Sequence, residues 1–236
     1  MQPGDYETAF EIPTPWGLCV AVRLPLQAPS AEPDELPDLH PDEVAFASSL
    51  PGPRRITWIG GRIALRRAMR AIGEGRGPIF ANPRGAPSVP PGIAASLSHK
   101  RVLAVAIATR MQGATLGIDI EDATPRNFDI ARRVLVPEEL QALQRLPETE
   151  RWLGFIARFS LKESTYKAID PFVARYVAFA EATVRVGREP GDAAIALELK
   201  NNEGPFDIAA WWTIRDGHII SVVRASPACG GSRRVP

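Results

Sequence analysis

Cysteine and histidine are scarce in this sequence, which has two of the first and three of the second among 236 residues. The two cysteines, Cys19 and Cys229, are far apart in the chain. They form neither a CxxC metal-binding spacing nor a disulfide framework. The scarcity therefore argues against a disulfide-bonded scaffold and a catalytic thiol, and it fits a reducing compartment.

Long apolar segments are also missing. No apolar run approaches the ~18–20 residues that a bilayer span needs. The first ten residues have neither the basic nor the apolar region of a secretory signal. We therefore expect a cytoplasmic protein without a membrane segment.

Neither sign of charge is in clear excess. The sequence has 28 Lys and Arg residues and 27 Asp and Glu residues, which gives a net charge of +1 at pH 7 with neutral histidines. Binding to a nucleic acid duplex needs clustered Lys and Arg to neutralise phosphates, so we do not expect a nucleic acid partner. A chain of this length forms one large domain or two small ones, and its core needs no disulfide or metal.

Several common motifs are absent as well. The sequence contains no Walker A loop, GxGxxG, HExxH or GxSxG. It therefore gives no support to a P-loop, Rossmann, zincin or serine hydrolase function.

The hydrophobic pattern predicts strands and helices in the first half of the chain. Alternating apolar residues predict a strand over residues 16–24, and helical spacing predicts an amphipathic helix over 57–72 with arginines on one side. We expect Arg67 and Arg70 to lie on a solvated face of that helix. Two further strands, over 96–109 and 114–122, could form a hairpin.

The second half begins with helices and ends with strands. Pro137 stands at an expected first helical position, and a second helix is expected from about residue 150. The expected strands cover residues 176–186, 194–199, 208–214 and 218–223. An Asp216-Gly217 turn would join the last two as a hairpin.

Two acidic residues alternate with isoleucines in Gly117-Ile118-Asp119-Ile120-Glu121. In a strand, Asp119 and Glu121 would share one face, about 6.5–7 Å apart. Such a pair repels itself unless a cation, a proton or an arginine compensates, and Mg²⁺ binds one or two carboxylates with water and a phosphate-bearing substrate. Taken alone, the pattern fits an ordinary strand edge with salt bridges better than a metal site.

The helix expected after residue 150 adds charged residues to an apolar stripe. The stripe consists of Trp152, Phe155, Ile156, Phe159, Glu163, Tyr166 and Lys167. A charge on such a face is costly unless it is paired or binds a metal. A simple ion pair between Glu163 and Lys167 would explain them. If the helix packs beside the Asp119 strand, however, the site holds three carboxylates and one ammonium group, which suits a metal and a phosphate.

Together, these two segments resemble the signature of the 4′-phosphopantetheinyl transferases, G-[IV]-D-x-E followed about forty residues later by [FW]-S-x-K-E-x-x-x-K. The second segment here reads Phe159-Ser160-Leu161-Lys162-Glu163-Ser164-Thr165-Tyr166-Lys167. The segment Ser96-Leu97-Ser98-His99 and the stretch from Gly61 to Arg66 resemble two further elements of the family. The resemblance extends over residues 55–225.

The length resembles the double-length type of this family, a monomer of two similar halves, and the subgroup that activates non-ribosomal peptide and siderophore synthetases. The resemblance implies an α+β fold with two similar α/β halves in one chain, related by a pseudo-twofold axis, each a small sheet packed on a long helix. We assign the nucleotide and coenzyme A contacts to an N-terminal half (1–113) and the metal site to a C-terminal half (114–225). A flexible tail (226–236) would follow.

The resemblance also implies a reaction. Family members transfer the 4′-phosphopantetheine arm of coenzyme A to a serine of an acyl or peptidyl carrier protein, with Mg²⁺, and release adenosine 3′,5′-bisphosphate. On this reading Asp119, Glu121 and Glu163 hold Mg²⁺. Glu163 is also the expected base, and Lys167 neutralises charge on the diphosphate.

The remaining expected contacts are with coenzyme A. They come from Arg66, Arg84, Ser98, His99 and Lys162. Ala86 stands where many relatives have lysine, so Arg84 would take over that phosphate contact.

Two other functions remain open. Three carboxylates and a lysine also suit a Mg²⁺-dependent phosphoryl or nucleotide hydrolase, because they do not specify the acceptor. A non-catalytic module that binds coenzyme A or a carrier protein could use the same groove, with Asp119 and Glu121 only forming salt bridges.

Overall fold

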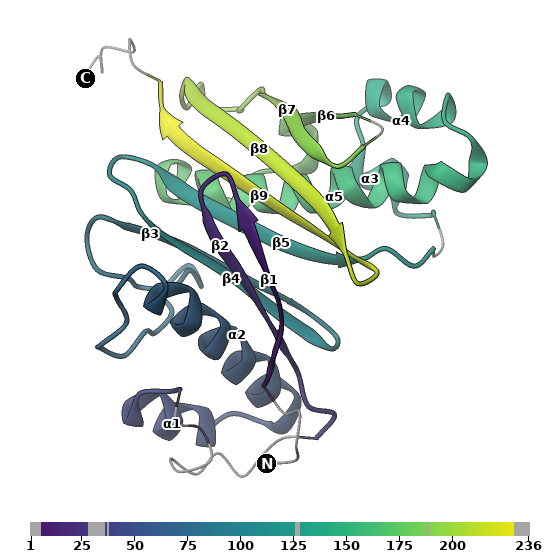
Figure 1. The fold of residues 1–236 in the computed structure, drawn as a ribbon. Coiled ribbons are helices and arrows are strands. Elements are labelled where there is room, and N and C mark those ends of the chain that lie inside the picture. Colours follow the sequence, from purple (N-terminus) through teal and green to yellow (C-terminus); the bar gives the residue numbers. More distant parts are fainter. Residues whose placement is uncertain (1–5, 28–35, 37, 126–127, 188, 229–236) are drawn as a thin grey trace. The chain divides into compact units, whose positions relative to one another are not determined.

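The computed structural model describes residues 6–27, 36, 38–125, 128–187 and 189–228. The chain divides into two compact units, Met1–Gln112 and Gly113–Pro236. Each unit has one antiparallel sheet and one long helix, α2 (Gly52–Arg70) in the first and α5 (Glu148–Val173) in the second (Figure 1). The predicted α+β class is therefore confirmed. Within the described ranges, no helix is both long enough and apolar enough to cross a membrane.

The first unit has a four-stranded sheet in the order β1-β2-β4-β3. Its strands are β1 (Thr8–Thr14), β2 (Gly17–Arg23), β3 (Ile93–Lys100) and β4 (Leu103–Arg110). Helix α1 (Pro41–Ser48) precedes α2, which packs on β2 and β4. The predicted single strand over residues 96–109 is wrong, because the chain reverses at Arg101, which has a φ of +36°.

The second unit has a five-stranded sheet in the order β5-β9-β8-β7-β6. Its strands are β5 (Thr115–Asp122), β6 (Ala182–Val186), β7 (Gly191–Leu197), β8 (Phe206–Arg215) and β9 (His218–Pro227). The short helices α3 (Ala131–Val134) and α4 (Pro137–Gln144) precede α5. The α5 helix packs on β5 and β9.

The strand pairing settles two predicted hairpins. The hairpin across Asp216 and Gly217 is confirmed, since both residues have the positive φ that a tight hairpin turn needs. The hairpin between residues 96–109 and 114–122 is wrong, because β4 pairs with β2 and β3, whereas β5 pairs with β9. Residues 226 and 227, which were expected to belong to a flexible tail, are the last residues of β9. Residues 229–236 lie outside the described part of the chain.

A buried glutamate joins the two helices of the first unit. Glu43, in the first turn of α1, is fully buried, and its Oε2 accepts hydrogen bonds from the His40 amide (2.9 Å) and Arg66 Nε (2.5 Å). Its Oε1 accepts from the Ile79 amide at 2.7 Å. Arg66 also donates to the carbonyls of Gly75 and Gly77, both at 2.8 Å. The pair therefore fixes α1, α2 and the loop after α2 to one another.

A second buried glutamate has the same role in the other unit. Glu139, in the first turn of α4, accepts from the Val136 amide (2.8 Å) and Lys162 Nζ (2.9 Å) through Oε2, and from the Val184 amide (2.6 Å) through Oε1. Lys162 Nζ also donates to the carbonyls of Phe179 (2.8 Å) and Ala182 (2.6 Å). This pair fixes α4, α5 and strand β6.

The two pairs reveal a shared framework. In both units the cation follows the glutamate by 23 residues, from Glu43 to Arg66 and from Glu139 to Lys162. In both units an arginine four residues before the cation is also buried, Arg62 in α2 and Arg158 in α5. These matching positions define a register between α2 and α5.

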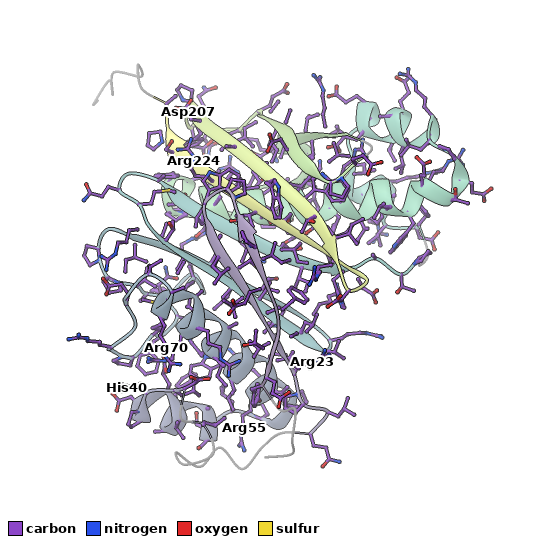
Figure 2. All side chains as sticks on the ribbon, in the orientation of Figure 1. Arg23, His40, Arg55, Arg70, Asp207 and Arg224 are labelled. Atoms are coloured by element: carbon purple, nitrogen blue, oxygen red, sulfur yellow. The ribbon has the colours of Figure 1, made fainter. Side chains whose placement is uncertain are left out.

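The arginines expected on a solvated face of α2 are in fact paired. Arg67 donates to Asp38 Oδ2 (Nη2 at 2.6 Å) and to the Tyr6 carbonyl (2.8 Å), and Arg70, labelled in Figure 2, contacts Asp38 Oδ1. Burial acts to raise the pKa of Asp38, but hydrogen bonds from Arg70 and Arg67 outweigh it and hold that pKa below its usual value. The solvated position is confirmed for Arg70, whose side chain is 52% exposed, whereas the side chain of Arg67 is only 24% exposed. The pairing of both arginines with Asp38, just before α1, left no local signal in the sequence.

Acid should weaken the second unit through Glu181. Hydrogen bonds from Arg175 hold the pKa of Glu181 at about 2 against a usual 4.5, although burial opposes this shift. The native state therefore binds this proton less readily than the unfolded state does. Its stabilising contribution is full above pH 4.5 and is lost as the pH falls towards 2.

The measurement is the free energy of unfolding in urea at several pH values between 7 and 3. We expect Glu181→Gln to be less stable than the parent at pH 7 and to lose less stability on acidification. Glu198→Gln, at an exposed position, serves as the control. Identical pH profiles for the parent and Glu181→Gln would contradict this prediction.

Candidate active site

Gly117 sets the distance between strand β5 and helix α5. A Cβ atom at this position would lie 1.8 Å from the Ser164 carbonyl oxygen and 2.8 Å from the Ala168 amide nitrogen. Only glycine allows the helix backbone to approach the strand so closely. The contact brings α5 against the face of β5 that carries Gly117, Asp119 and Glu121.

This close packing places a lysine beside an aspartate. Lys167 Nζ of α5 donates to Asp119 Oδ1 and to the Ile118 carbonyl, both at 2.9 Å. The side chain of Asp119 is 7% exposed, whereas that of Lys167 is 31% exposed. The carboxylate is therefore held below the surface, and the ammonium group reaches it from a more open position.

The other oxygen of Asp119 is held by serines. Ser160 Oγ of α5 donates to Asp119 Oδ2 at 3.0 Å and lies 2.8 Å from Ser221 Oγ of β9. Ser221 Oγ in turn lies 2.6 Å from Ser164 Oγ. All three serines have no exposed surface. Asp119 is thus fixed from two sides, by an ammonium group and by a row of hydroxyls.

The other two acidic residues lie near this pair in the sequence. Glu121, on the same face of β5 as Asp119, is buried (8% exposed), and Glu163 is half-buried on α5. Burial and the neighbouring Glu163 carboxylate both raise the pKa of Tyr166. Asp119 and Glu121 therefore share one face of β5, and Glu163 lies on the helix that packs against that strand.

The donor set can be compared with the needs of a magnesium ion. In the described part of the chain, no three His, Cys, Asp or Glu side chains gather closely enough to hold a metal ion on their own. Mg²⁺ does not need three protein ligands, because it binds one or two carboxylates and completes its coordination shell with water and phosphate oxygens. Asp119 and Glu121 fit this requirement, and Glu163 as a third ligand stays a prediction.

The residues predicted to bind coenzyme A in the first unit are in different environments. Arg84 is exposed in a turn in which Asn82 Oδ1 accepts from the amides of Arg84 (2.9 Å) and Ala86 (3.1 Å). On β3, His99 is exposed and Ser98 is buried, and as successive strand residues they face opposite sides of the sheet. Their contacts with coenzyme A stay predictions.

Two of the predicted contacts come from the buried cations of the fold. Arg66 donates to Glu43 and to two loop carbonyls, and Lys162 directs three hydrogen bonds to Glu139, Phe179 and Ala182. An ammonium group has three protons, so Lys162 would have to give up a partner to bind a phosphate. Burial lowers the pKa of Lys162, and Glu139 opposes that shift.

Sequence reasoning gave no role to Ser160 and did not identify Ser221. A signal was present for Ser221, which interrupts the apolar run Ile219 to Val223, because a hydroxyl in a buried strand needs a hydrogen-bond partner. The identity of that partner depends on the pairing of β5 with β9, in which Ser221 stands directly opposite Asp119.

Comparisons with known proteins agree with the signature. Residues 115–223 match the 4′-phosphopantetheinyl transferase superfamily, and residues 42–109 match the 4′-phosphopantetheinyl transferase N-terminal domain. The 4′-phosphopantetheinyl transferase Npt of Nocardia iowensis is 30% identical over 85% of this chain and 96% of its own length. The corresponding enzyme Svp of Streptomyces mobaraensis is 31% identical over 81% of this chain and 80% of its own.

A solved structure, the Chronobacterium ammoniagenes ACPS–CoA complex, is similar at 17% identity with a TM-score of 0.40, over 50% of this chain and 99% of that one. The sequence matches cover both units and include the Asp119 and Lys167 segments. The chain therefore belongs to the 4′-phosphopantetheinyl transferase superfamily and is a transferase of that type.

Proposed function

We propose that this protein transfers the 4′-phosphopantetheine arm of coenzyme A to a serine of an acyl or peptidyl carrier protein, with Mg²⁺, and releases adenosine 3′,5′-bisphosphate. The observation that carries the proposal is the Asp119–Lys167 pair beside Glu121, inside the segment that matches the superfamily. The names of the relatives support phosphopantetheinyl transfer.

The roles of the side chains follow from charge. The serine oxygen attacks the phosphorus that carries the pantetheine arm, and the bond from that phosphorus to the oxygen of the adenosine-side phosphate breaks. The diphosphate of coenzyme A brings negative charge to the site, so neutralisation of that charge and in-line positioning supply most of the acceleration. Mg²⁺ held by Asp119 and Glu121 would neutralise diphosphate charge. Lys167 adds a positive charge to the leaving phosphate, and Glu163 accepts the serine proton.

The first unit would bind the nucleotide end of coenzyme A. We assign this contact to Arg84, Ser98 and His99, with Arg66 as a further contact. For Lys162, in the second unit, we also propose a contact with coenzyme A. The exposed positions of Arg84 and His99 support their part of this assignment. We further propose a monomer that acts on carrier proteins of non-ribosomal peptide and siderophore synthetases.

The test is intact-mass spectrometry of an apo carrier protein incubated with this protein, coenzyme A and Mg²⁺. A gain of one phosphopantetheine, about 340 Da, that disappears with EDTA is the expected result. Breakdown of coenzyme A without modification of the carrier would replace this proposal with a hydrolase. Binding of coenzyme A without either reaction, across acyl and peptidyl carrier proteins, would replace it with a binding module.

A further inference from the structure

We propose that Ser164, Ser221 and Ser160 form a hydrogen-bonded relay that positions the Asp119 carboxylate for cation binding. The inference rests on the proposed function, because it adds positioning residues to the same site. The relay consists of hydrogen bonds between side chains from two elements, α5 and β9, and ends on a residue of a third, β5.

Proton counting gives the relay a direction. A carboxylate only accepts hydrogen bonds, so the single hydroxyl proton of Ser160 goes to Asp119. Ser221 must then donate to Ser160 across 2.8 Å. Ser164 must donate to Ser221, whose Oγ lies at 2.6 Å and whose carbonyl oxygen lies at 3.1 Å. The protons of Ser160 and Ser221 thus point towards Asp119, and the proton of Ser164 points to Ser221.

A row of hydroxyls aligned in this way has a physical consequence. Each donated hydrogen bond polarises the next, so the bond that reaches Asp119 is stronger than an isolated serine would make. It fixes Oδ2, while Lys167 binds Oδ1. The orientation of the carboxylate is therefore set before any cation binds.

The matching helix of the first unit shows that packing does not require these hydroxyls. With Arg66 aligned to Lys162, the positions of Ser160 and Ser164 correspond to Ala64 and Ala68 of α2. Both alanines are fully buried and α2 packs on its sheet as α5 does. Burying a hydroxyl without a hydrogen-bond partner costs free energy. The hydrogen bonds that lead to Asp119 therefore explain why serines occupy these two positions.

The test measures metal affinity in the full-length protein by electron paramagnetic resonance of Mn²⁺, used as a probe for Mg²⁺. We expect Ser160→Ala to raise the Kd for Mn²⁺ about 10–100-fold, as loss of a residue that supports a metal ligand does. Ser221→Ala should raise it by a smaller factor, because Ser160 can still donate to Asp119. The Mg²⁺ concentration for half-maximal transfer should rise in the same order.

The matched control is Thr165→Val. Thr165 is fully buried on the same helix, and its hydroxyl donates to the Leu161 carbonyl, outside the relay. Its loss should leave the Kd within about 2-fold of the parent value, since no support of a ligand is removed. Urea unfolding checks that each variant is folded. Should Ser160→Ala fail to fold, Ser160→Cys and Ser221→Ala decide the question.

The outcomes separate the relay from the proposed function. A parent protein that binds Mn²⁺, with serine variants that bind it equally well, would overturn the relay and leave the proposed transfer intact. A parent protein that transfers the arm but binds no Mn²⁺ would overturn both the relay and the magnesium assignment. A parent protein with no transfer at all, which nevertheless shows the graded loss of Mn²⁺ affinity, would support the relay and contradict the proposed reaction.

Discussion

Replacing Asp119 by alanine is expected to lower kcat/KM for transfer at least about 100-fold, because the change removes a proposed ligand of Mg²⁺ and the anionic partner of Lys167. Stability should also fall, by about 1–3 kcal/mol, since Ser160 and Lys167 lose a buried acceptor. Asp119 is 5% exposed and hydrogen-bonded on both oxygens.

Mass-spectrometric initial rates at several Mg²⁺ concentrations, together with urea unfolding, measure the two effects. The control is Asp122→Ala, which removes a carboxylate three residues along the chain, at the end of the same strand. Asp122→Ala should retain most of the activity. An Asp119→Ala protein with parental activity and an unchanged Mg²⁺ requirement would remove Asp119 from the metal site.

Replacing Gly117 by alanine is expected to lower the free energy of unfolding by about 3 kcal/mol or more, at the upper end of the cost of overpacking. The new Cβ would meet backbone atoms of α5, the Ser164 carbonyl and the Ala168 amide, and backbone cannot rotate out of the way. The helix would have to move off β5. Because Lys167 and Ser160 reach Asp119 from that helix, transfer should be lost together with stability.

Gly77→Ala provides the matched control, since a Cβ at Gly77 meets no atom within 4 Å and the residue has no positive φ. Thermal and urea unfolding should show that Gly117→Ala is clearly less stable than Gly77→Ala. If Gly117→Ala unfolds at the parental urea concentration, the close approach of α5 and β5 is not as described.

The elements around the site were predictable where the signal is local. Alternating Ile118 and Ile120 predict the strand, Pro137 marks the start of α4, and Asp216-Gly217 gives the last hairpin. The helical stripe was also informative, because Trp152 and Phe155 are buried in the core of the second unit. Patterns of this kind depend on residues a few positions apart, which the sequence displays directly.

The contacts that decide the chemistry are not local. Ser221 stands opposite Asp119 although about a hundred residues separate them, and no short-range pattern gives the register of such a pair. Buried cations were equally hard to foresee. The family resemblance implied coenzyme A contacts for Arg66 and Lys162, whereas in the structure their side chains contact Glu43 and Glu139 with nearby carbonyls. A sequence shows a charge but not what neutralises it.

The shared register of α2 and α5 also bears on the history of the chain. The residue after the buried cation is Arg67 in the first unit, where it follows Arg66, and Glu163 in the second, where it follows Lys162. The same position of the shared framework therefore carries opposite charges in the two units. The same buried glutamate and cation therefore support two helices with different neighbouring charges, as two specialised copies of one framework would. The second unit has an acidic residue at this helix position, which suits a cation, and the first unit has a basic one.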